Sequence, residues 1–270
     1  MKIGPDSVRA TAISGSNADT IIVRGRDLAG ELIGKISFAE HAWLLITGAL
    51  PSEPQRRIFD AALVAIAEHG LVPSVQAARI TLAAAPEALQ GAVAAGLLGC
   101  GSVILGSSQA AGQFLAEIVA ASGPNGLDLA VRDVVARYRA ERRAIPGYGH
   151  PLHKARDARA ERLFAVAAEV GLSGAHVAAA EAVERLLPEL IGRRLAINVS
   201  GAIPAVLLDA GYPLLALKGA PLLARTASLI AHLLEEQTRP IGFALSEAAS
   251  ADIGYDGPAP EGFVADEQAG

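Results

Sequence analysis

Apolar residues recur at helical spacing along most of the chain, and helix-capping residues mark two of the expected helix starts. Ser37 and Glu40 form a capping box, which predicts a helix that begins after Ser37 and ends at Gly48. Ser52 and Gln55 form a second box, and a proline is tolerated in the first turn that follows it. The residues expected on the buried faces of these two helices are Ala42, Leu45 and Ile46, and Ile58, Ala62, Leu63 and Ile66.

Further segments have the same helical pattern, and one short segment has the pattern of a strand. The additional helices are expected over residues 127–143, 156–170, 174–187, 202–209 and 221–236. The buried stripe of the first of these would be Val131, Val134, Val135 and Tyr138. The β-branched run at residues 20–23, followed by a turn at 24–27, predicts a β-hairpin. The sequence therefore predicts an all-α protein with a small N-terminal hairpin and an irregular tail after Asp252.

The stretch over residues 88–116 carries no charged residue and is long enough to cross a bilayer. Its glycine, serine and glutamine residues dilute the apolar character, and no aromatic belt or basic flank follows it. Because small residues let helix backbones approach closely, we expect a helix–loop–helix buried in a core or a subunit interface. No association with a membrane is expected.

Composition narrows the class of protein without identifying it. The 270-residue chain is 51% hydrophobic and 19% charged, which excludes a disordered protein and allows a sizeable core. Its net charge of −5, without blocks of Lys or Arg, gives no electrostatic reason to bind nucleic acid. The single cysteine, Cys100, excludes an internal disulfide, and no spacing of Cys, His, Asp or Glu suggests a metal site. The first six residues lack the apolar run of a signal peptide, so a cytoplasmic location is expected.

The segment with the most potential chemistry spans residues 142–159, where histidines, a lysine and several arginines lie close together. The loop over residues 146–149 contains a proline and two glycines, so its backbone can approach a ligand closely, and His150 follows it. One interpretation is an anion site with a histidine that transfers a proton. The other is a solvated basic helix start, paired with Asp157 and Glu161.

Residues 146–151, followed by Lys154 and by residues 157–159, resemble a signature of the citrate synthase family, with Ala158 where the family has proline. The short length and the sequence of residues 95–99 resemble the citryl-CoA lyase module, which also forms the C-terminal part of ATP-citrate lyase. Other segments match the family in the same order along nearly the whole chain: residues 22–28, 37–40, 44–51, 68–70, 198–200, 224–232, 239–240 and 255–258.

This resemblance implies a citrate synthase-like fold of two helical domains. The large domain would comprise residues 1–112 and 200–270, and the small domain residues 113–199. It also implies an intertwined homodimer with an active site between the domains. The substrates would be a coenzyme A thioester and a di- or tricarboxylic acid, and no tightly bound cofactor is expected.

The resemblance also assigns roles to residues at matching positions. His69 and His150 would contact the tertiary hydroxyl or ketone oxygen and exchange its proton. Arg159, Arg225 and Arg239 would hold the carboxylates, because guanidinium groups bind carboxylates bidentately and stay charged. In the family the last of these arginines reaches across the dimer, so Arg239 would serve the partner's site. The residues expected near coenzyme A are Ile145, Pro146, Gly147, Tyr148, Gly149 and Lys154.

Two positions depart from the family pattern. The loop over residues 101–106 has no histidine where synthases have one, a difference shared by citryl-CoA lyase modules. Ser200 occupies the position of the family's catalytic aspartate, and a serine hydroxyl is too weak a base, and too poor an acid, for proton transfer at the acetyl group. Either another residue substitutes, with Asp209 and Asp252 as candidates, or the reaction differs, or the chain is an inefficient catalyst.

The sequence therefore predicts an enzyme, a citryl-CoA lyase-like C–C lyase. It would cleave a citryl-CoA-type thioester into acetyl-CoA, or a homologue, and oxaloacetate, or a related keto acid. One alternative is a citrate or methylcitrate synthase-type acyltransferase, against which both departures count. The other is a non-catalytic homologue that keeps the acid-binding arginines and binds coenzyme A or a carboxylate without turnover.

Overall fold

The computed structural model describes residues 10–103, 105–123, 126–149 and 155–262. The chain folds into two compact units. Unit 1 comprises Met1–Ile66 and Leu105–Pro221, and unit 2 comprises Ala67–Ile104 and Leu222–Gly270. The boundaries of these units differ from those of the domains that the resemblance implies, which are residues 1–112 with 200–270 and residues 113–199. The division into those two domains stays a prediction.

Unit 1 begins with a small antiparallel sheet in the order β1-β2-β3. The turn between the second and third strands contains Arg24 at φ 49° and Gly25 at φ 80°. Asp27 then caps a single turn of π-helix, Leu28–Leu32, by accepting the backbone N–H groups of Ala29 and Gly30. The predicted hairpin is confirmed, and a third strand extends it. The strands are β1 (Ser14–Ser16), β2 (Ile21–Val23) and β3 (Arg26–Asp27).

Both predicted capping boxes start helices, which are α1 (Phe38–Thr47) and α2 (Glu53–Ala67). The Ser37 hydroxyl accepts the Glu40 N–H at 3.2 Å, and the Glu40 carboxylate accepts the Ser37 N–H at 2.7 Å. Helix α1 ends at Gly48 in the left-handed conformation, as predicted.

The buried face of α1 differs from the predicted one. Its buried residues are Ala42, Trp43 and Leu44, whereas Leu45 and Ile46 are only half-buried. The Trp43 ring packs against the rings of Phe59 and Tyr212, with centroids 5.5 and 5.4 Å away. This aromatic cluster turns the helix so that its core face centres on Trp43.

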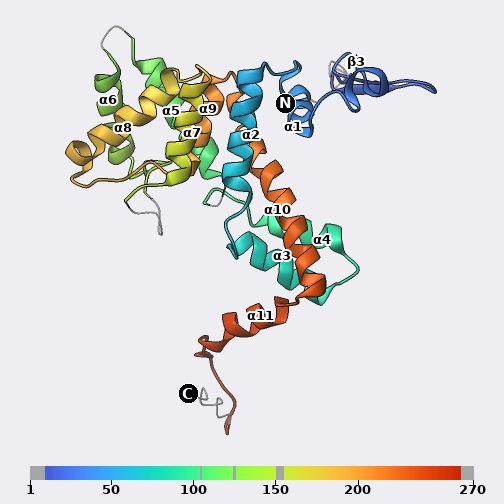
Figure 1. Cartoon of the computed structure of the whole chain (residues 1–270). Helices are drawn as coiled ribbons and strands as arrows, with labels where there is room; N and C mark the ends of the chain where they lie inside the picture. The colour runs from blue at the N-terminus through green and yellow to red at the C-terminus, as the bar shows by residue number, and fades with distance from the viewer. Residues whose placement is uncertain (1–9, 104, 124–125, 150–154, 263–270) are drawn as a thin grey trace, which may run out of the picture. The chain divides into compact units, whose positions relative to one another are not determined.

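The rest of unit 1 is a group of helices around α9 (Figure 1). Helix α9 packs against α5, α7 and α8, and α6 packs against α5 and α8. Most side chains of α9 are buried, which its run of apolar residues from Gly201 to Leu208 allows. The predicted stripe of α6 is confirmed, since all four of its residues are buried. The bounds are α5 (Ser107–Ala121), α6 (Leu127–Ala140), α7 (Ala158–Glu169), α8 (Ala175–Ile191), α9 (Val199–Asp209) and the 3₁₀ turn η2 (Leu214–Ala216).

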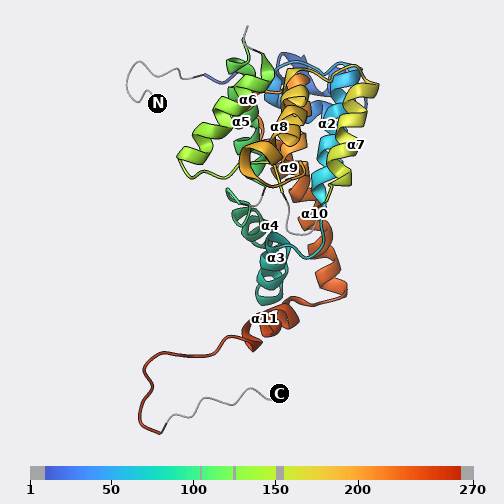
Figure 2. The ribbon, with the colours of Figure 1, turned by 90° about the vertical axis from the view of Figure 1, so that its left-hand side faces the viewer.

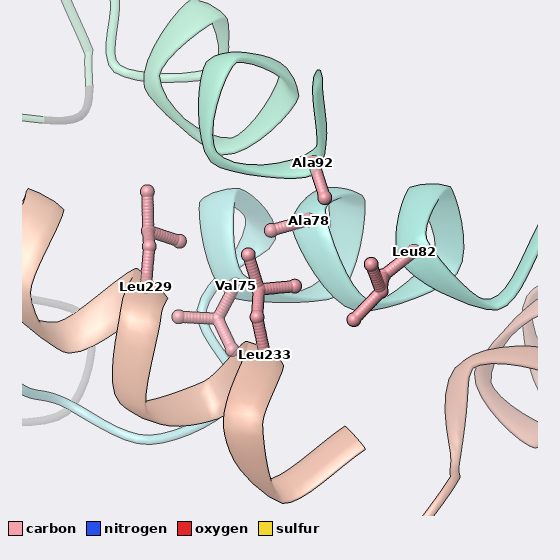
Figure 3. Close-up of a cluster of buried hydrophobic side chains, with 6 residues drawn as sticks. All are labelled: Val75, Ala78, Leu82, Ala92, Leu229 and Leu233. Carbon is pink, nitrogen blue, oxygen red and sulfur yellow. The ribbon is translucent and has the colours of Figure 1, made fainter. Parts of the chain in front are cut away.

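Unit 2 is built from α3, α4, α11 and most of α10. Its core joins three of these helices, and the six side chains involved are Val75, Ala78, Leu82, Ala92, Leu229 and Leu233 (Figure 3). Helix α11 packs against α3 (Figure 2). Neither α3 nor α11 was expected from the sequence pattern. The bounds are α3 (Pro73–Ala84), α4 (Leu89–Leu98), α10 (Gly219–Thr238) and α11 (Gly242–Ala251).

The uncharged stretch over residues 88–116 forms two helices, α4 and the first part of α5, and the chain between them is not helical where the structure describes it. The prediction of two helices with a loop is confirmed, and the two helices belong to different units. A different stretch, Leu214–Thr238, is long and apolar enough to cross a membrane by length and composition. Core helices of soluble proteins meet the same criterion, and Leu229 and Leu233 of this stretch lie in the core of unit 2.

Candidate functional site

The predicted glycine loop of unit 1 is held by backbone hydrogen bonds to the segment before α9. The Gly149 N–H donates to the Ala196 carbonyl at 2.8 Å, and the Asn198 N–H donates to the Gly147 carbonyl at 2.9 Å. A β-bridge between Tyr148 and Ile197 continues the same pairing. The loop therefore lies alongside the segment that leads into α9 and is paired with it.

Glycine is required where this loop meets the first turn of α9. Gly147 has φ 88°, a conformation that L side chains rarely adopt. A Cβ atom on Gly147 would lie 2.7 Å from the Cα atom of Gly201, and one on Gly201 would lie 2.6 Å from the Gly147 carbonyl oxygen. The two backbones are thus in direct contact, which only a pair of glycines permits.

Tyr148 anchors the loop from inside the unit. The residue is 8% exposed, and its hydroxyl donates to the Ala180 carbonyl of α8 at 2.9 Å. Burial raises the pKa of this phenol well above its ordinary value, so it stays protonated at neutral pH. The Tyr148 side chain is therefore structural, and the part of this residue left for a ligand is its backbone.

Asp157 joins the starts of α7 and α9. It caps α7, and its buried carboxylate accepts Nε and Nη2 of Arg159 at 3.0 and 2.9 Å and the Val199 N–H at 2.9 Å. Burial alone would raise the pKa of Asp157, but the hydrogen bonds from Arg159 and Val199 outweigh burial and lower it. Asp157 is therefore an ionised clamp that orients the Arg159 guanidinium.

Both carboxylates named for a solvated helix start are paired. Asp157 binds Arg159, whose side chain is only 23% exposed. Glu161 forms an exposed ion pair with Arg156 at 3.4 Å. An anion site at this segment stays a prediction. His150 and Lys154, predicted for proton transfer and for coenzyme A, lie outside the described residues.

Ser200 is the second residue of α9 and is half-buried. Its backbone N–H and that of Gly201 donate to the Asn198 side-chain oxygen at 2.9 and 3.2 Å. The Asn198 amide nitrogen in turn donates to the Gly149 carbonyl at 2.6 Å. Asn198 thus connects the glycine loop to the helix start that carries Ser200.

Asp209 does not replace the missing aspartate. Its carboxylate accepts the backbone N–H groups of Gly174, His176 and Val177 at 2.7–2.9 Å, and Nδ1 of His176 lies 2.8 Å away. Burial alone would raise the pKa of Asp209, but these contacts outweigh burial and lower it. Because α9 rises about 1.5 Å per residue, Asp209 lies about 13 Å along the helix from Ser200. Asp252 follows α11 and is exposed.

In unit 2, Glu68 connects the segment containing His69 to α10. Its carboxylate accepts the Gly70 N–H and the Ser228 hydroxyl, and Nε2 of His232 lies 3.1 Å from Oε2. Burial raises the pKa of Glu68, but the three contacts outweigh burial and lower it. Arg225, predicted to bind a carboxylate, lies one turn earlier on α10 and is 3% exposed.

A second ionic cluster in unit 2 was missed by sequence reasoning. Arg79 is 2% exposed and donates Nε to Glu236 at 2.6 Å, Nη1 to Glu235 at 2.8 Å and Nη2 to the Arg239 carbonyl at 3.0 Å. Glu236 also accepts the Gly242 N–H at 2.7 Å, which caps α11. The Arg239 side chain is 81% exposed and lies 3.6 Å from Glu235. Arg79 and Glu236 are 157 residues apart, so no local motif could have connected them.

The structure thus gathers the predicted residues into two groups. In unit 1 the described part of the glycine loop, Arg159 and Ser200 lie around the starts of α7 and α9. In unit 2 His69 and Arg225 lie near Glu68, whereas Arg239 follows the C-terminal end of α10. Within the described ranges, no three His, Cys, Asp or Glu side chains gather as a metal site would require.

A helical chain with this glycine loop, a clamped arginine and an Asn-capped buried helix has the order of features expected of citrate synthase-like proteins. Residues 51–242 match the model of the citrate synthase C-terminal domain, and the chain belongs to the citrate synthase family. Comparison with curated protein sequences gives no match.

Solved structures confirm the predicted fold. Citryl-CoA lyase from Hydrogenobacter thermophilus is 32% identical, with a TM-score of 0.84, and the match covers 96% of this chain and 98% of that one. ATP citrate lyase from Methanothrix soehngenii, in complex with citrate and coenzyme A, is 23% identical with a TM-score of 0.78 over 96% of this chain and 43% of that one. Citrate synthase from Thermotoga maritima is 22% identical with a TM-score of 0.65, over 85% and 60% of the two chains.

Proposed function

We propose that the chain is a citryl-CoA lyase-like C–C lyase that acts on a citryl-CoA-type 3-hydroxyacyl thioester. The observation that carries this proposal is the similarity to citryl-CoA lyase, which extends over nearly the full length of both chains at 32% identity. The products are acetyl-CoA, or a homologue, and oxaloacetate, or a related keto acid.

The reaction needs one base, carboxylate-binding groups and one acid. His150 or His69 takes the proton of the tertiary hydroxyl, and the oxygen lone pair forms the ketone. The electron pair of the broken C–C bond passes to the acetyl carbon as a thioester enolate, which then takes a proton. Arg159 and Arg225 hold the acid through both steps.

Arg239 is the third predicted carboxylate ligand, and its place on the chain supports a role in a homodimer. It lies 14 residues after Arg225, which corresponds to about 21 Å along a helix. One small acid fits poorly between two side chains so far apart on one subunit. We therefore assign Arg239 to the site of a partner subunit. A separate part of the proposal is that the protein is located in the cytoplasm.

Ser200 makes the enolate protonation the weakest step of this proposal. The two buried carboxylates of unit 1 near the ends of α9, Asp157 and Asp209, are both held ionised by several donors and are poor proton donors. This observation favours the second candidate, a homologue that binds coenzyme A and a carboxylate with little turnover. A synthase-type condensation is disfavoured further, since it needs a base at the same position.

A coupled assay tests the proposal. The protein is incubated with citryl-CoA, and released oxaloacetate is followed with malate dehydrogenase and NADH. We expect cleavage that is lost in His150→Ala and kept in His41→Ala, a change on α1 at a residue not predicted to belong to the site. No turnover, together with citrate or coenzyme A binding by calorimetry, would replace the lyase with the binding homologue. Net condensation of acetyl-CoA with oxaloacetate would favour the synthase.

Ser200→Asp is the sharpest single substitution. If the missing carboxylate limits the enolate step, this variant should cleave citryl-CoA faster than the wild type, by roughly tenfold or more. Ser200→Ala is the matched control and should bring no gain. A loss of existing activity in Ser200→Asp would mean that the chain runs different chemistry at this position.

A further inference from the structure

Glu68 makes contacts in two directions from a single carboxylate. Oε1 accepts the N–H of Gly70, within its own loop, and Oε2 accepts the hydroxyl of Ser228 and faces Nε2 of His232. Both α10 residues are mostly enclosed, because Ser228 is 7% exposed and the His232 side chain 16% exposed. Glu68 therefore connects the loop before α3 to one face of α10.

The contact with Gly70 closes the chain around His69. Gly70 has φ 70°, and its carbonyl accepts the Val72 N–H at 2.8 Å, at the start of α3. His69 thus lies in the chain between Glu68, which is bound to α10, and the turn at Gly70, which leads directly into α3. The backbone of His69 is set by the carboxylate that precedes it.

The α10 face held by Glu68 also carries Arg225. Arg225, Ser228 and His232 have the spacing of three and four residues that places side chains on one side of a helix. Burial lowers the pKa of the Arg225 guanidinium, and the negative charge of Glu68 opposes this change. The helix face that binds the Glu68 carboxylate is therefore the face that carries Arg225.

We propose that Glu68 is a positioning residue, whose carboxylate fixes the backbone of His69 beside α10 through its contacts with Gly70, Ser228 and His232. The inference rests on the proposed function, in which His69 and Arg225 contact the acid part of the substrate. Glu68 itself takes no part in bond making or proton transfer.

Glu68→Gln tests this role, because glutamine keeps the size of the side chain and removes its charge. Glu87→Gln is the matched control, since Glu87 is an exposed glutamate of the same unit. In Glu68→Gln we expect kcat/KM for citryl-CoA to fall tenfold or more, and the Kd for citrate measured by calorimetry to rise by a similar factor. Glu87→Gln should stay within twofold of the wild type, and helical circular dichroism should be unchanged in both.

A Glu68→Gln variant within twofold of an active wild type, in both measurements, would overturn the inference. Ser228→Ala removes one donor to the Glu68 carboxylate, so its loss of kcat/KM and of citrate affinity should be smaller. In the double variant this loss should not add fully to that of Glu68→Gln. Fully additive losses in the double variant would show that Glu68 and Ser228 act independently, which would also overturn the inference. If Glu68→Gln fails to fold, Ser228→Ala decides instead, and a wild-type kcat/KM and citrate Kd in Ser228→Ala would overturn the inference. If the wild type binds citrate without cleaving citryl-CoA, the lyase proposal fails and the citrate Kd values decide the role of Glu68. If it does neither, both proposals fall.

Discussion

In unit 1 the glycine loop and the helix start that carries Ser200 are held mainly by hydrogen bonds to backbone groups, whereas in unit 2 the chain around His69 and Arg239 is held by ionised side chains. The glycine loop of unit 1 pairs with the chain before α9, and Asn198 and Asp157 bind backbone N–H groups. In unit 2, Glu68 and Glu236 bind residues on other helices or loops through their charged groups.

The two kinds of contact should respond to different substitutions. Backbone pairing depends on φ, ψ and close approach, so unit 1 should be most sensitive to added atoms. Buried ion pairs depend on charge balance, so unit 2 should be most sensitive to the loss of one partner.

Glu236→Gln should cause the largest loss of stability. It leaves the buried guanidinium of Arg79 without its best partner, and removing one member of a buried pair costs about 3–5 kcal/mol. Urea unfolding gives the free energy directly. Glu235→Gln is the matched control, because Glu235 binds the same arginine from a side chain that is 43% exposed, and it should change stability little. Equal losses in both variants would contradict the assignment of Glu236 as the buried partner.

Gly201→Ala should cause a smaller loss, and in unit 1. The added Cβ atom would lie 2.6 Å from the Gly147 carbonyl oxygen, so the loop or the helix must shift. Overpacking of this kind costs about 2 kcal/mol, and kcat/KM should fall as the loop moves. Gly15→Ala is the control, because a Cβ atom there meets nothing within 4 Å, and urea unfolding should show little change. An unchanged Gly201→Ala would show that the contact is not tight.

Local capping signals explain why the starts of two helices could be predicted from neighbouring residues. Ser37 and Ser52 lie directly before their helices, and each makes the expected reciprocal contacts. Helix α3 has no side-chain cap at its first turn, and α11 is capped by Glu236, six residues before Gly242. A cap that comes from the end of another helix leaves no mark in the sequence around the helix that it starts.

The candidate site divides in the same way. The glycine loop and the arginine after Asp157 form a local motif, so they could be identified from neighbouring residues. The role of Glu68 could not, because its partners Ser228 and His232 lie 160 and 164 residues away. For the same reason the sequence could not exclude Asp209 as a replacement carboxylate, because its partners at the start of α8 are 32–35 residues away. Charge networks between distant helices are fixed by tertiary packing, which local pattern does not encode.

The smallest predicted effect concerns pH and compares one carboxylate from each unit. The pKa values of Asp157 and Glu68 are both lowered in the folded protein. Such a group stabilises the fold above its unfolded pKa of about 4, and that stability is lost as pH falls through the folded pKa. Asp157→Asn should therefore lower the free energy of unfolding by about 1–2 kcal/mol at pH 7, and this gap should narrow towards pH 3.

Glu68→Gln should show the same trend with a smaller gap, below about 1 kcal/mol, because the Glu68 side chain is 50% exposed and water screens its charge. Urea unfolding of both variants and the wild type at pH 7, 5, 4 and 3 measures the two gaps. A gap that widens in acid would reverse the sign expected for a lowered pKa. A larger gap for Glu68→Gln than for Asp157→Asn would mean that the charge of Glu68 contributes more to stability than its exposure indicates. It would also mean that Asp157 stabilises unit 1 less by its charge than by hydrogen bonds that an asparagine side chain can still accept.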